Sequence, residues 1–155
     1  MSFVKKILIG LLLIIIAVQF YRPVQNNDPS AMPNHISKVV PIPDQVNGIL
    51  KKACYDCHSN NTRYPWYAQI QPVNSFVNKH IKAAKAELNF DNFKEYTLRR
   101  QISKLRAIEN SIADGTMPIA SYTLIHKNAV LTKDEKKLIE AWTTASKDSL
   151  EKVQF

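Results

Sequence analysis

Cys54-Tyr55-Asp56-Cys57-His58 is the stretch of sequence that decides how this chain folds. It contains both cysteines of the protein, and a histidine directly follows the second one. Two thiols at this spacing can add across the two vinyl groups of a haem, and the adjacent imidazole can then bind the iron. The motif therefore predicts one covalently attached haem c, held by Cys54 and Cys57, with His58 as the proximal ligand of the iron.

Three other interpretations of this motif fit the sequence less well. A dithiol redox site of the Cys-x-x-Cys type belongs in a βαβ setting, whereas the flanking sequence has helical periodicity. A zinc site needs four ligands, and the histidines of this chain lack the paired spacing of a zinc finger. A disulfide between Cys54 and Cys57 would close so short a loop that it would stabilise little.

The composition indicates one domain with an appendage and a thin core. The chain has 155 residues and an ordinary hydrophobic content of 45%, but the first 20 residues take a large share of it. The remainder is short of core-forming side chains, and a haem would supply a large apolar plate for them to pack on. We therefore expect the domain without its haem to be largely unfolded.

The charge of the chain excludes one class of partner. The formal net charge is +8, and it falls to +5 after Arg22. This modest excess fits a solvated surface, and it could favour an anionic partner or a membrane surface. Because no basic stripe alternates with aromatic residues, we do not expect binding to nucleic acid.

Residues 1–22 have the composition of a membrane-targeting segment. Lys5 and Lys6 precede an apolar run over residues 7–18, whose length also fits a signal peptide. No A-x-A-like cleavage site follows, and the 19 residues 3–21 would form about 28 Å of helix, enough to span a bilayer. We therefore favour an uncleaved single-pass anchor over a cleaved signal, with the two lysines in the cytoplasm.

This orientation would place the rest of the chain in the periplasm, on the outer side of the bacterial cytoplasmic membrane. Haem is attached to Cys-x-x-Cys-His motifs on that side, so two independent signals agree. Residues 23–45 contain five prolines, which predict an extended, semi-rigid linker. Residues 46–155 would then form the haem-binding domain.

Apolar residues at helical spacing predict that this domain is all-α. The expected helices begin near four capping residues, Asp44, Ser75, Thr97 and Thr132. The last of them opens a capping box with Glu135, and Gly115 supplies a stop for the third helix. The charged tail from about Lys147 is expected to fray.

The residues that could complete the iron coordination lie after Gly115. Met117 comes next to Pro118, and a thioether is a soft ligand suited to haem iron. We therefore predict Met117 as the distal ligand, although it could also be a gap-filling methionine. His126 is the strongest alternative ligand, His80 comes next, and an open distal site is the last.

A polar turn and an aromatic patch follow the motif over residues 59–67. The aromatic side chains are interpreted as packing on the haem. Arg63 is interpreted either as pairing a haem propionate or as a solvated side chain.

The order of these features is similar in general plan to class I cytochromes c. More closely, the chain resembles the small bacterial haem-binding domain family common in Bacteroidetes. The stretches that carry the resemblance are residues 54–60, 64–67, 98–101, 117–118 and 122–126. The resemblance covers nearly all of residues 40–147, and it implies haem c binding and electron transfer.

The sequence thus predicts a small all-α, cytochrome c-like domain wrapped around one covalent haem c and preceded by a membrane-anchor helix. The predicted function is that of a membrane-tethered periplasmic mono-haem cytochrome, which carries one electron between redox protein partners and is not an enzyme. The alternatives are a haem sensor or peroxidase-like protein with an open distal site, and the cytochrome subunit of a larger oxidase complex.

Overall fold

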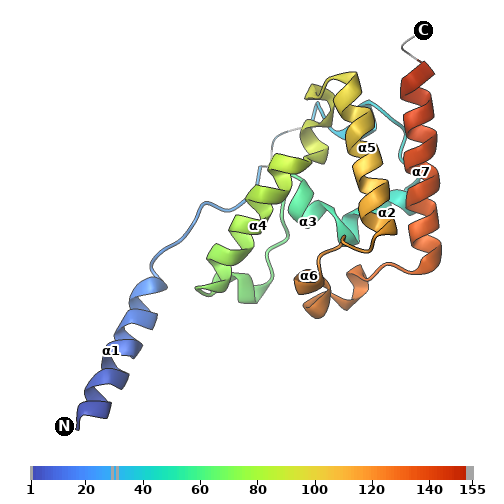
Figure 1. Cartoon of the computed structure of the whole chain (residues 1–155). Coiled ribbons are helices and arrows are strands. Elements are labelled where there is room, and N and C mark those ends of the chain that lie inside the picture. Colours follow the sequence, from blue (N-terminus) through green and yellow to red (C-terminus); the bar gives the residue numbers. More distant parts are fainter. Residues whose placement is uncertain (1, 29, 31, 153–155) are drawn as a thin grey trace.

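The computed structural model describes residues 2–28, 30 and 32–152, and in this part of the chain the fold is all-α, as predicted (Figure 1). The described residues form seven α-helices and four 3₁₀ helices, and only an isolated bridge between Asn27 and Asn61 has β geometry. In chain order the helices are α1 (Phe3–Val18), η1 (Ile36–Lys38), α2 (Asp44–Ala53), α3 (Tyr55–His58), η2 (Trp66–Gln69), α4 (Val73–Glu87), η3 (Phe90–Glu95), α5 (Leu98–Ala113), α6 (Ala120–Ile125), η4 (Lys127–Ala129) and α7 (Lys133–Glu151).

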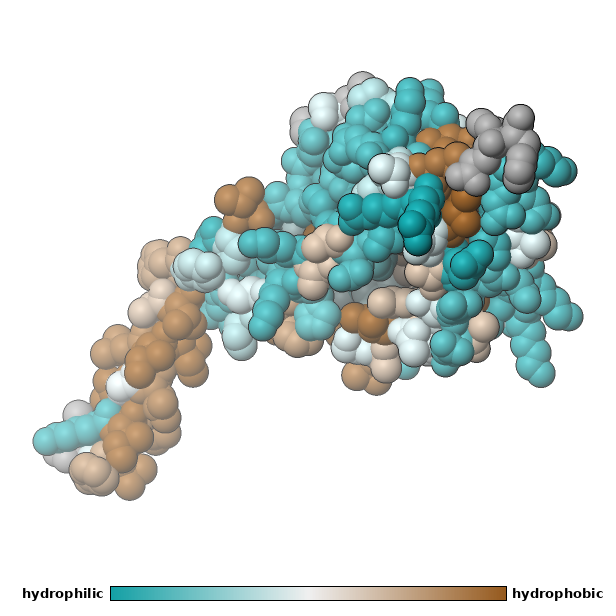
Figure 2. Space-filling model, turned by 45° about the horizontal axis from the view of Figure 1, so that its top comes forward, coloured by the Kyte–Doolittle hydropathy of each residue, from teal (hydrophilic) through white to brown (hydrophobic). Residues whose placement is uncertain are grey.

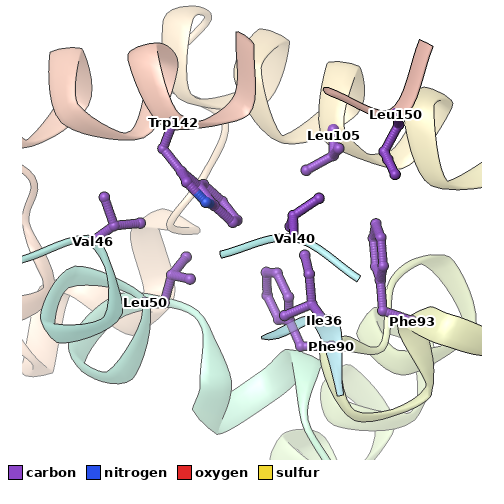
Figure 3. Close-up of a cluster of buried hydrophobic side chains, with 9 residues drawn as sticks. All are labelled: Ile36, Val40, Val46, Leu50, Phe90, Phe93, Leu105, Trp142 and Leu150. Atoms are coloured by element: carbon purple, nitrogen blue, oxygen red, sulfur yellow. The ribbon is translucent and has the colours of Figure 1, made fainter. Parts of the chain in front are cut away.

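The main hydrophobic core lies where α5 and α7 pack side by side and α2 packs against α7 (Figure 1). η1 and η3 close the same core from the other side (Figure 3). Its buried members are Ile36, Val40, Val46, Leu50, Phe90, Phe93, Leu105, Trp142 and Leu150 (Figure 3). Each side chain of this size that leaves water contributes about 1.5–3 kcal/mol, so this cluster supplies most of the apolar stabilisation of the domain.

The second half of the predicted linker belongs to this core. Ile36 and Val40 are 0% and 1% exposed, and the indole Nε1 of Trp142 donates a hydrogen bond of 3.0 Å to the carbonyl oxygen of Pro41. The prolines prevent an α-helix, as predicted, but the short 3₁₀ helix η1 and the turn after it still bury Ile36 and Val40. The prediction of a linker is therefore wrong for residues 36–41; Pro29 lies outside the described residues.

The predicted helix caps are confirmed at two of the four positions. The side chain of Thr97 accepts the backbone N–H of Arg100, and Thr132 forms the predicted capping box with Glu135. α2 begins at Asp44 without a side-chain cap.

α4 begins at Val73, two residues before the predicted cap Ser75. The Ser75 hydroxyl donates instead to Oε1 of Gln71. Pro72 occupies the N-cap position of α4, and Pro suits a helix start because it has no N–H to satisfy there.

α7 is longer than expected. It continues to Glu151, and Leu150 in its last turn is only 7% exposed because it packs into the main core. The prediction that the chain frays from Lys147 is therefore wrong up to Glu151, and residues 153–155 lie outside the described residues. The helix persists because burial of its apolar face outweighs the weak propensity of the charged tail.

α1 stands away from the body of the protein (Figure 1), and apolar side chains cover most of the face of it that Figure 2 shows. None of its residues is buried. Directly after α1, Gln19 and Gln71 form a reciprocal pair, in which Nε2 of Gln19 donates to the Gln71 carbonyl and the Gln71 N–H donates to Oε1 of Gln19. In the part of the chain that the structure describes, no helix combines the length and the apolar character that a membrane crossing requires.

α3, α4 and α6 form a second half of the domain, in which few apolar side chains are buried. α4 buries only Asn74 and Ile81 among its described residues, and α6 buries none. Hollows therefore lie between these helices and α5, and the Cys-x-x-Cys-His motif borders them.

Candidate functional site

The motif forms a tight helical turn at the end of α2. The N–H groups of Cys57 and His58 both donate to the carbonyl oxygen of Cys54, at 3.1 and 3.0 Å. This turn becomes the short helix α3, which packs between α2 and α4. Both cysteines are free thiols.

The imidazole of His58 is held in one orientation and one tautomer. Its Nδ1 lies 3.0 Å from the carbonyl oxygen of Leu88, and because a carbonyl only accepts, Nδ1 carries the hydrogen. Burial lowers the pKa of His58, so the ring is neutral. A neutral ring protonated at Nδ1 keeps the lone pair of Nε2 for a metal, and a carbonyl partner on the other nitrogen is the usual support of a metal-binding histidine.

Two adjoining hollows flank His58. We name them the Cys54 hollow, of about 260 Å³, and the Cys57 hollow, of about 250 Å³. They share five lining residues, Ala53, His58, Glu87, Met117 and Pro118. The Cys54 hollow is lined besides by Cys54, Leu88, Phe90, Lys104, Ile108 and Ile112. The Cys57 hollow is lined besides by Cys57, His80, Ala83, Ala84, Ile119 and Tyr122.

This arrangement fits a haem. Each hollow contains one thiol, His58 borders both, and most of the other lining side chains are apolar. Together the hollows fall within the range of about 300–1,000 Å³ that small-molecule and cofactor sites occupy. A covalently attached planar group with one thioether bond in each hollow would therefore find apolar walls.

The predicted distal ligand, Met117, lines both hollows and is 37% exposed. The end of α5 places it there. Gly115 takes φ = 68°, and the N–H groups of Thr116 and Met117 both donate to the carbonyl oxygen of Ser111, at 3.0 and 3.2 Å. This is a Schellman-type end, and it fixes the backbone of Met117 next to the hollows.

The two rival histidines lie in different places. His126 lines neither hollow: its Nε2 lies 2.6 Å from the hydroxyl of Tyr67, and its ring stacks on Tyr122 at 4.2 Å. His80 lines the Cys57 hollow, and its Nδ1 lies 3.0 Å from the carbonyl oxygen of Phe76. The structure thus brings Met117 and His80 to the hollows with His58, whereas His126 lines a smaller hollow of about 120 Å³ that it shares with Cys57 and His80 but not with His58.

Asp56, inside the motif, is a positioning residue that sequence reasoning missed. Its carboxylate is nearly buried and accepts bonds from Nε of Arg63 at 3.0 Å and from the hydroxyl of Tyr122 at 2.8 Å. Burial and the bond to this carboxylate raise the pKa of Tyr122. The Arg63 side chain is 71% exposed, as the solvated interpretation expected, and it also pairs with the carboxylate of Asp56 inside the motif.

Lys104 is a further residue of the site that the sequence did not reveal. Its side chain extends from α5, is only 18% exposed and lines the Cys54 hollow. Its Nζ lies 3.7 Å from a carboxylate oxygen of Glu87, which is well exposed. Helical periodicity alone could not reveal this, since long side chains reach across a helix surface.

The turn after the motif is fixed by a second polar cluster. The N–H of Asn60 donates to Oδ2 of Asp91 at 2.6 Å, and Nδ2 of Asn26 donates to the carbonyl oxygen of Ser59 at 2.8 Å. These bonds connect the motif to η3 and to the segment that follows α1. They hold Leu88, the partner of His58, at its place before η3.

The thiols are poorly suited to the other interpretations of the motif. Burial raises the pKa of Cys54 to about 12 and that of Cys57 to about 11, so both stay protonated near neutral pH. A dithiol redox site depends on a thiolate with a lowered pKa. Within the described residues, no three His, Cys, Asp or Glu side chains form a group that could hold a metal ion, so a zinc cage lacks its ligands.

Comparison with known protein families gives a match over most of the chain. The model of a family described as "Haem-binding domain" matches residues 13–145. Searches of curated proteins and of solved structures found no match. The match confirms the family resemblance that the motif predicted, and it agrees with the largely apolar hollows between α3, α4 and α5.

Proposed function

This chain belongs to the haem-binding domain family, and we propose that it binds one haem c covalently and carries one electron between redox protein partners. In this proposal the thiols of Cys54 and Cys57 form the two thioether bonds. Each S–H adds across one vinyl group, so a sulfur–carbon bond forms at one carbon and the hydrogen goes to the other. His58 is the proximal ligand.

The orientation of His58 is the observation that carries the proposal. The hydrogen bond from Nδ1 to Leu88 leaves Nε2 available, at the border of two hollows that each contain one motif thiol. A histidine with a purely structural role would be expected to use both ring nitrogens in hydrogen bonds or packing. Met117 is the proposed distal ligand because it shares both hollows with His58.

Electron transfer is the chemistry that these side chains support best. A bound haem supplies a one-electron couple, and a His/Met pair raises its reduction potential. The chain's own part is to hold the ligands and exclude water, which Leu88, Phe90 and Ile108 do along the Cys54 hollow. Lys104 in the same hollow is placed to pair an anionic edge of the cofactor.

We propose further that α1 holds the domain on the outer face of the bacterial cytoplasmic membrane. The support is compositional: its apolar side chains are exposed in the isolated chain, and Lys5 and Lys6 precede them. Such a surface requires a lipid or protein partner to cover it. The lysines favour the orientation in which the haem domain faces the periplasm.

A haem sensor or peroxidase-like protein with an open distal site is the second candidate. The observation that favours it is His80, which lines the Cys57 hollow and keeps Nε2 free of protein partners within the described residues. A histidine in that place could act as a distal base. Binding of carbon monoxide by the ferrous wild-type protein as isolated would support this candidate over the carrier.

The ligand set is tested by spectra of the full-length protein in its ferric and ferrous states. Met117→Ala should lose the methionine-to-iron charge-transfer band and gain the ability to bind carbon monoxide. His80→Ala and His126→Ala are the matched controls and should keep the wild-type spectrum. An unchanged low-spin spectrum in Met117→Ala, with loss in His80→Ala, would transfer the distal role to His80.

The covalent attachment has its own test. Haem should stay with the wild-type chain in acidified organic solvent, and it should be released from the double variant Cys54→Ala/Cys57→Ala. The host must be competent to mature c-type cytochromes. Release of haem from the wild type under these conditions would refute the covalent link while leaving haem binding intact.

A further inference from the structure

A basic hollow lies on the flank of α4 that faces away from the haem site. Lys79, Lys82 and Lys85 follow one another at intervals of three residues, so they share one side of the helix. They line a hollow of about 550 Å³, together with Tyr21 and the segment after it. Its lining residues include no carboxylate, so the positive charges are not neutralised within the hollow.

Two of the three ammonium groups are free to bind a ligand. Lys85 donates to Oδ1 of Asn26. Lys79 and Lys82 are exposed, and within the described residues neither takes part in an ion pair or a side-chain hydrogen bond. Two adjacent lysines without counter-charges form a site for an anion.

Exposed aromatic and apolar side chains lie on the elements next to α4. Tyr21, which lines the hollow, is 65% exposed; Trp66 in η2 and Ile70 directly after η2, which packs on α4, are 76% and 46% exposed. Trp and Tyr are enriched at the headgroup level of membranes because their rings are apolar at one end and polar at the other. A charged hollow that contains Tyr21, next to an element that exposes Trp66, has the composition of a surface that lies against lipid.

The base of α1 is fastened to the same corner. Gln19 and Gln71 exchange two hydrogen bonds, and Nε2 of Gln71 also donates to the carbonyl oxygen of Tyr21 at 2.8 Å. Arg22 donates to the carbonyl oxygen of Gln69 in η2. Any membrane that receives α1 therefore meets the N-terminal end of α4 first (Figure 1).

We propose that this surface, which we name the basic corner (Tyr21, Trp66, Ile70, Lys79, Lys82 and Lys85), docks on anionic phospholipid headgroups. Lys79 and Lys82 bind the lipid phosphate, and Tyr21 and Trp66 lie at the interface. The proposal rests on the membrane location of α1 proposed above, and it replaces a loosely tethered domain with one held in a fixed orientation.

This orientation suits an electron carrier. The α4 residues of the Cys57 hollow are His80, Ala83, Ala84 and Glu87, and those of the basic hollow are Ser75, Asn78, Lys79, Ile81, Lys82 and Lys85. The two sets occupy different flanks of one helix. A domain docked through the basic corner would keep its haem site off the lipid and open to a partner protein.

The test uses the full-length, haem-loaded protein in vesicles of phosphatidylcholine, with or without one part in about three of phosphatidylglycerol. Lysines are acetylated briefly and read by mass spectrometry. Labelling of Lys79 and Lys82 should fall about fivefold in the anionic vesicles, as expected for lysines at an anionic surface. Lys133 and Lys137, exposed on the distant helix α7, should be labelled equally in both.

A pair of charge-matched variants tests whether the hollow itself is responsible. In Lys79→Gln/Lys82→Gln, labelling of Lys85 should no longer respond to phosphatidylglycerol. In Lys133→Gln/Lys137→Gln, the protection of Lys79, Lys82 and Lys85 should be the same as in the wild type. Protection that survives the first double variant would overturn the proposal.

Other results also refute lipid docking. Equal labelling in both kinds of vesicle, or no association with vesicles at all, would exclude it. Protection by inorganic phosphate in phosphatidylcholine vesicles, at the level given by the anionic lipid, would indicate a soluble anion instead. Haem content and spectra of the same samples keep the two proposals apart, because an intact haem without lipid protection refutes the docking alone.

Discussion

The two halves of this domain are stabilised by different kinds of contact. The core half, built from α2, α5, α7, η1 and η3, contains Phe93, Leu105 and Ile36, all with 0% exposure. The haem half, built from α3, α4 and α6, has hollows where the core half has side chains, and it is joined mainly by polar contacts such as those of Asp56.

This difference indicates which half of the domain is stable without the cofactor and which half depends on it. A buried large apolar side chain contributes about 1.5–3 kcal/mol, whereas a hydrogen bond contributes about 0.5–1.5 kcal/mol net. The core half therefore has its own source of stability, and the haem half acquires one when the hollows are filled. We therefore expect the apo-protein to unfold mainly in the haem half, rather than throughout the domain as the composition suggested.

Removal of the haem should have the largest effect. In the apo-protein made from Cys54→Ala/Cys57→Ala, amide exchange in α4 and α6 should approach that of an unstructured chain, while α5 and α7 stay protected. Hydrogen–deuterium exchange with mass spectrometry measures both regions in one experiment. Uniform loss of protection, or uniform retention, would contradict the division into two halves.

Phe93→Ala should destabilise the core half by about 3–5 kcal/mol, because it removes a fully buried ring and leaves a cavity. The loss should be alike with and without haem, as measured by denaturant unfolding followed by circular dichroism. Phe76→Ala, in which the ring is 54% exposed on α4, is the matched control and should cost less than about 1 kcal/mol in the apo-protein. A strong haem dependence of the Phe93→Ala effect would show that the halves are not independent.

Asp56→Asn should destabilise the haem-bound protein by about 1–3 kcal/mol, since an amide cannot accept from both Arg63 and Tyr122 as the carboxylate does. The measurement is the unfolding midpoint followed at the haem absorption band. Asp148→Asn, at an exposed site on α7, should change stability by less than about 0.5 kcal/mol. Equal effects of the two substitutions on the unfolding midpoint would contradict a positioning role for Asp56.

The same substitution at two glycines should change the stability in opposite directions. Gly115→Ala puts a side chain at φ = 68° and should cost about 1–2 kcal/mol while disturbing Met117. Gly48→Ala lies inside α2 with open space around it and should stabilise by about 0.5–1 kcal/mol. The shift in the thermal unfolding temperature of each variant measures the two effects. A higher unfolding temperature for Gly115→Ala would contradict a turn that requires glycine.

The smallest effect concerns a contact on the surface of the core half. The hydrogen bond from Lys52, at 2.6 Å, and then the N–H of Thr132 lower the pKa of Glu135 from its usual 4.5. Its stabilisation, about 0.2–1 kcal/mol for a surface pair, is present above pH 4.5 and is lost as the pH falls through the lowered pKa. Glu135→Gln should therefore reduce stability at pH 7 but not in strong acid, whereas Glu140→Gln, at an exposed site, should differ from the wild type at neither pH.

Local patterns in the sequence were sufficient to predict several features of the structure. The capping box at Thr132, the cap at Thr97 and the stop at Gly115 are short-range devices, so they could be read directly from neighbouring residues. The haem family was likewise readable, because Cys54, Cys57 and His58 are close together in the chain. Such features depend on residues only a few positions apart.

Contacts between distant residues were decided by the tertiary structure alone. The burial of Ile36 and Val40, the pairing of Asp56 with Tyr122 and the place of Lys104 beside the Cys54 hollow all join segments far apart in the chain. No local pattern specifies these pairs, because they depend on how helices cross and which side chains fill the space between them. The sequence by itself determined the haem motif, the all-α class, the caps at Thr97 and Thr132 and the stop at Gly115. The tertiary structure decided which nitrogen of His58 is free, which candidate ligands reach its hollows and which surface lies beside α1, since each of these is a relation between elements.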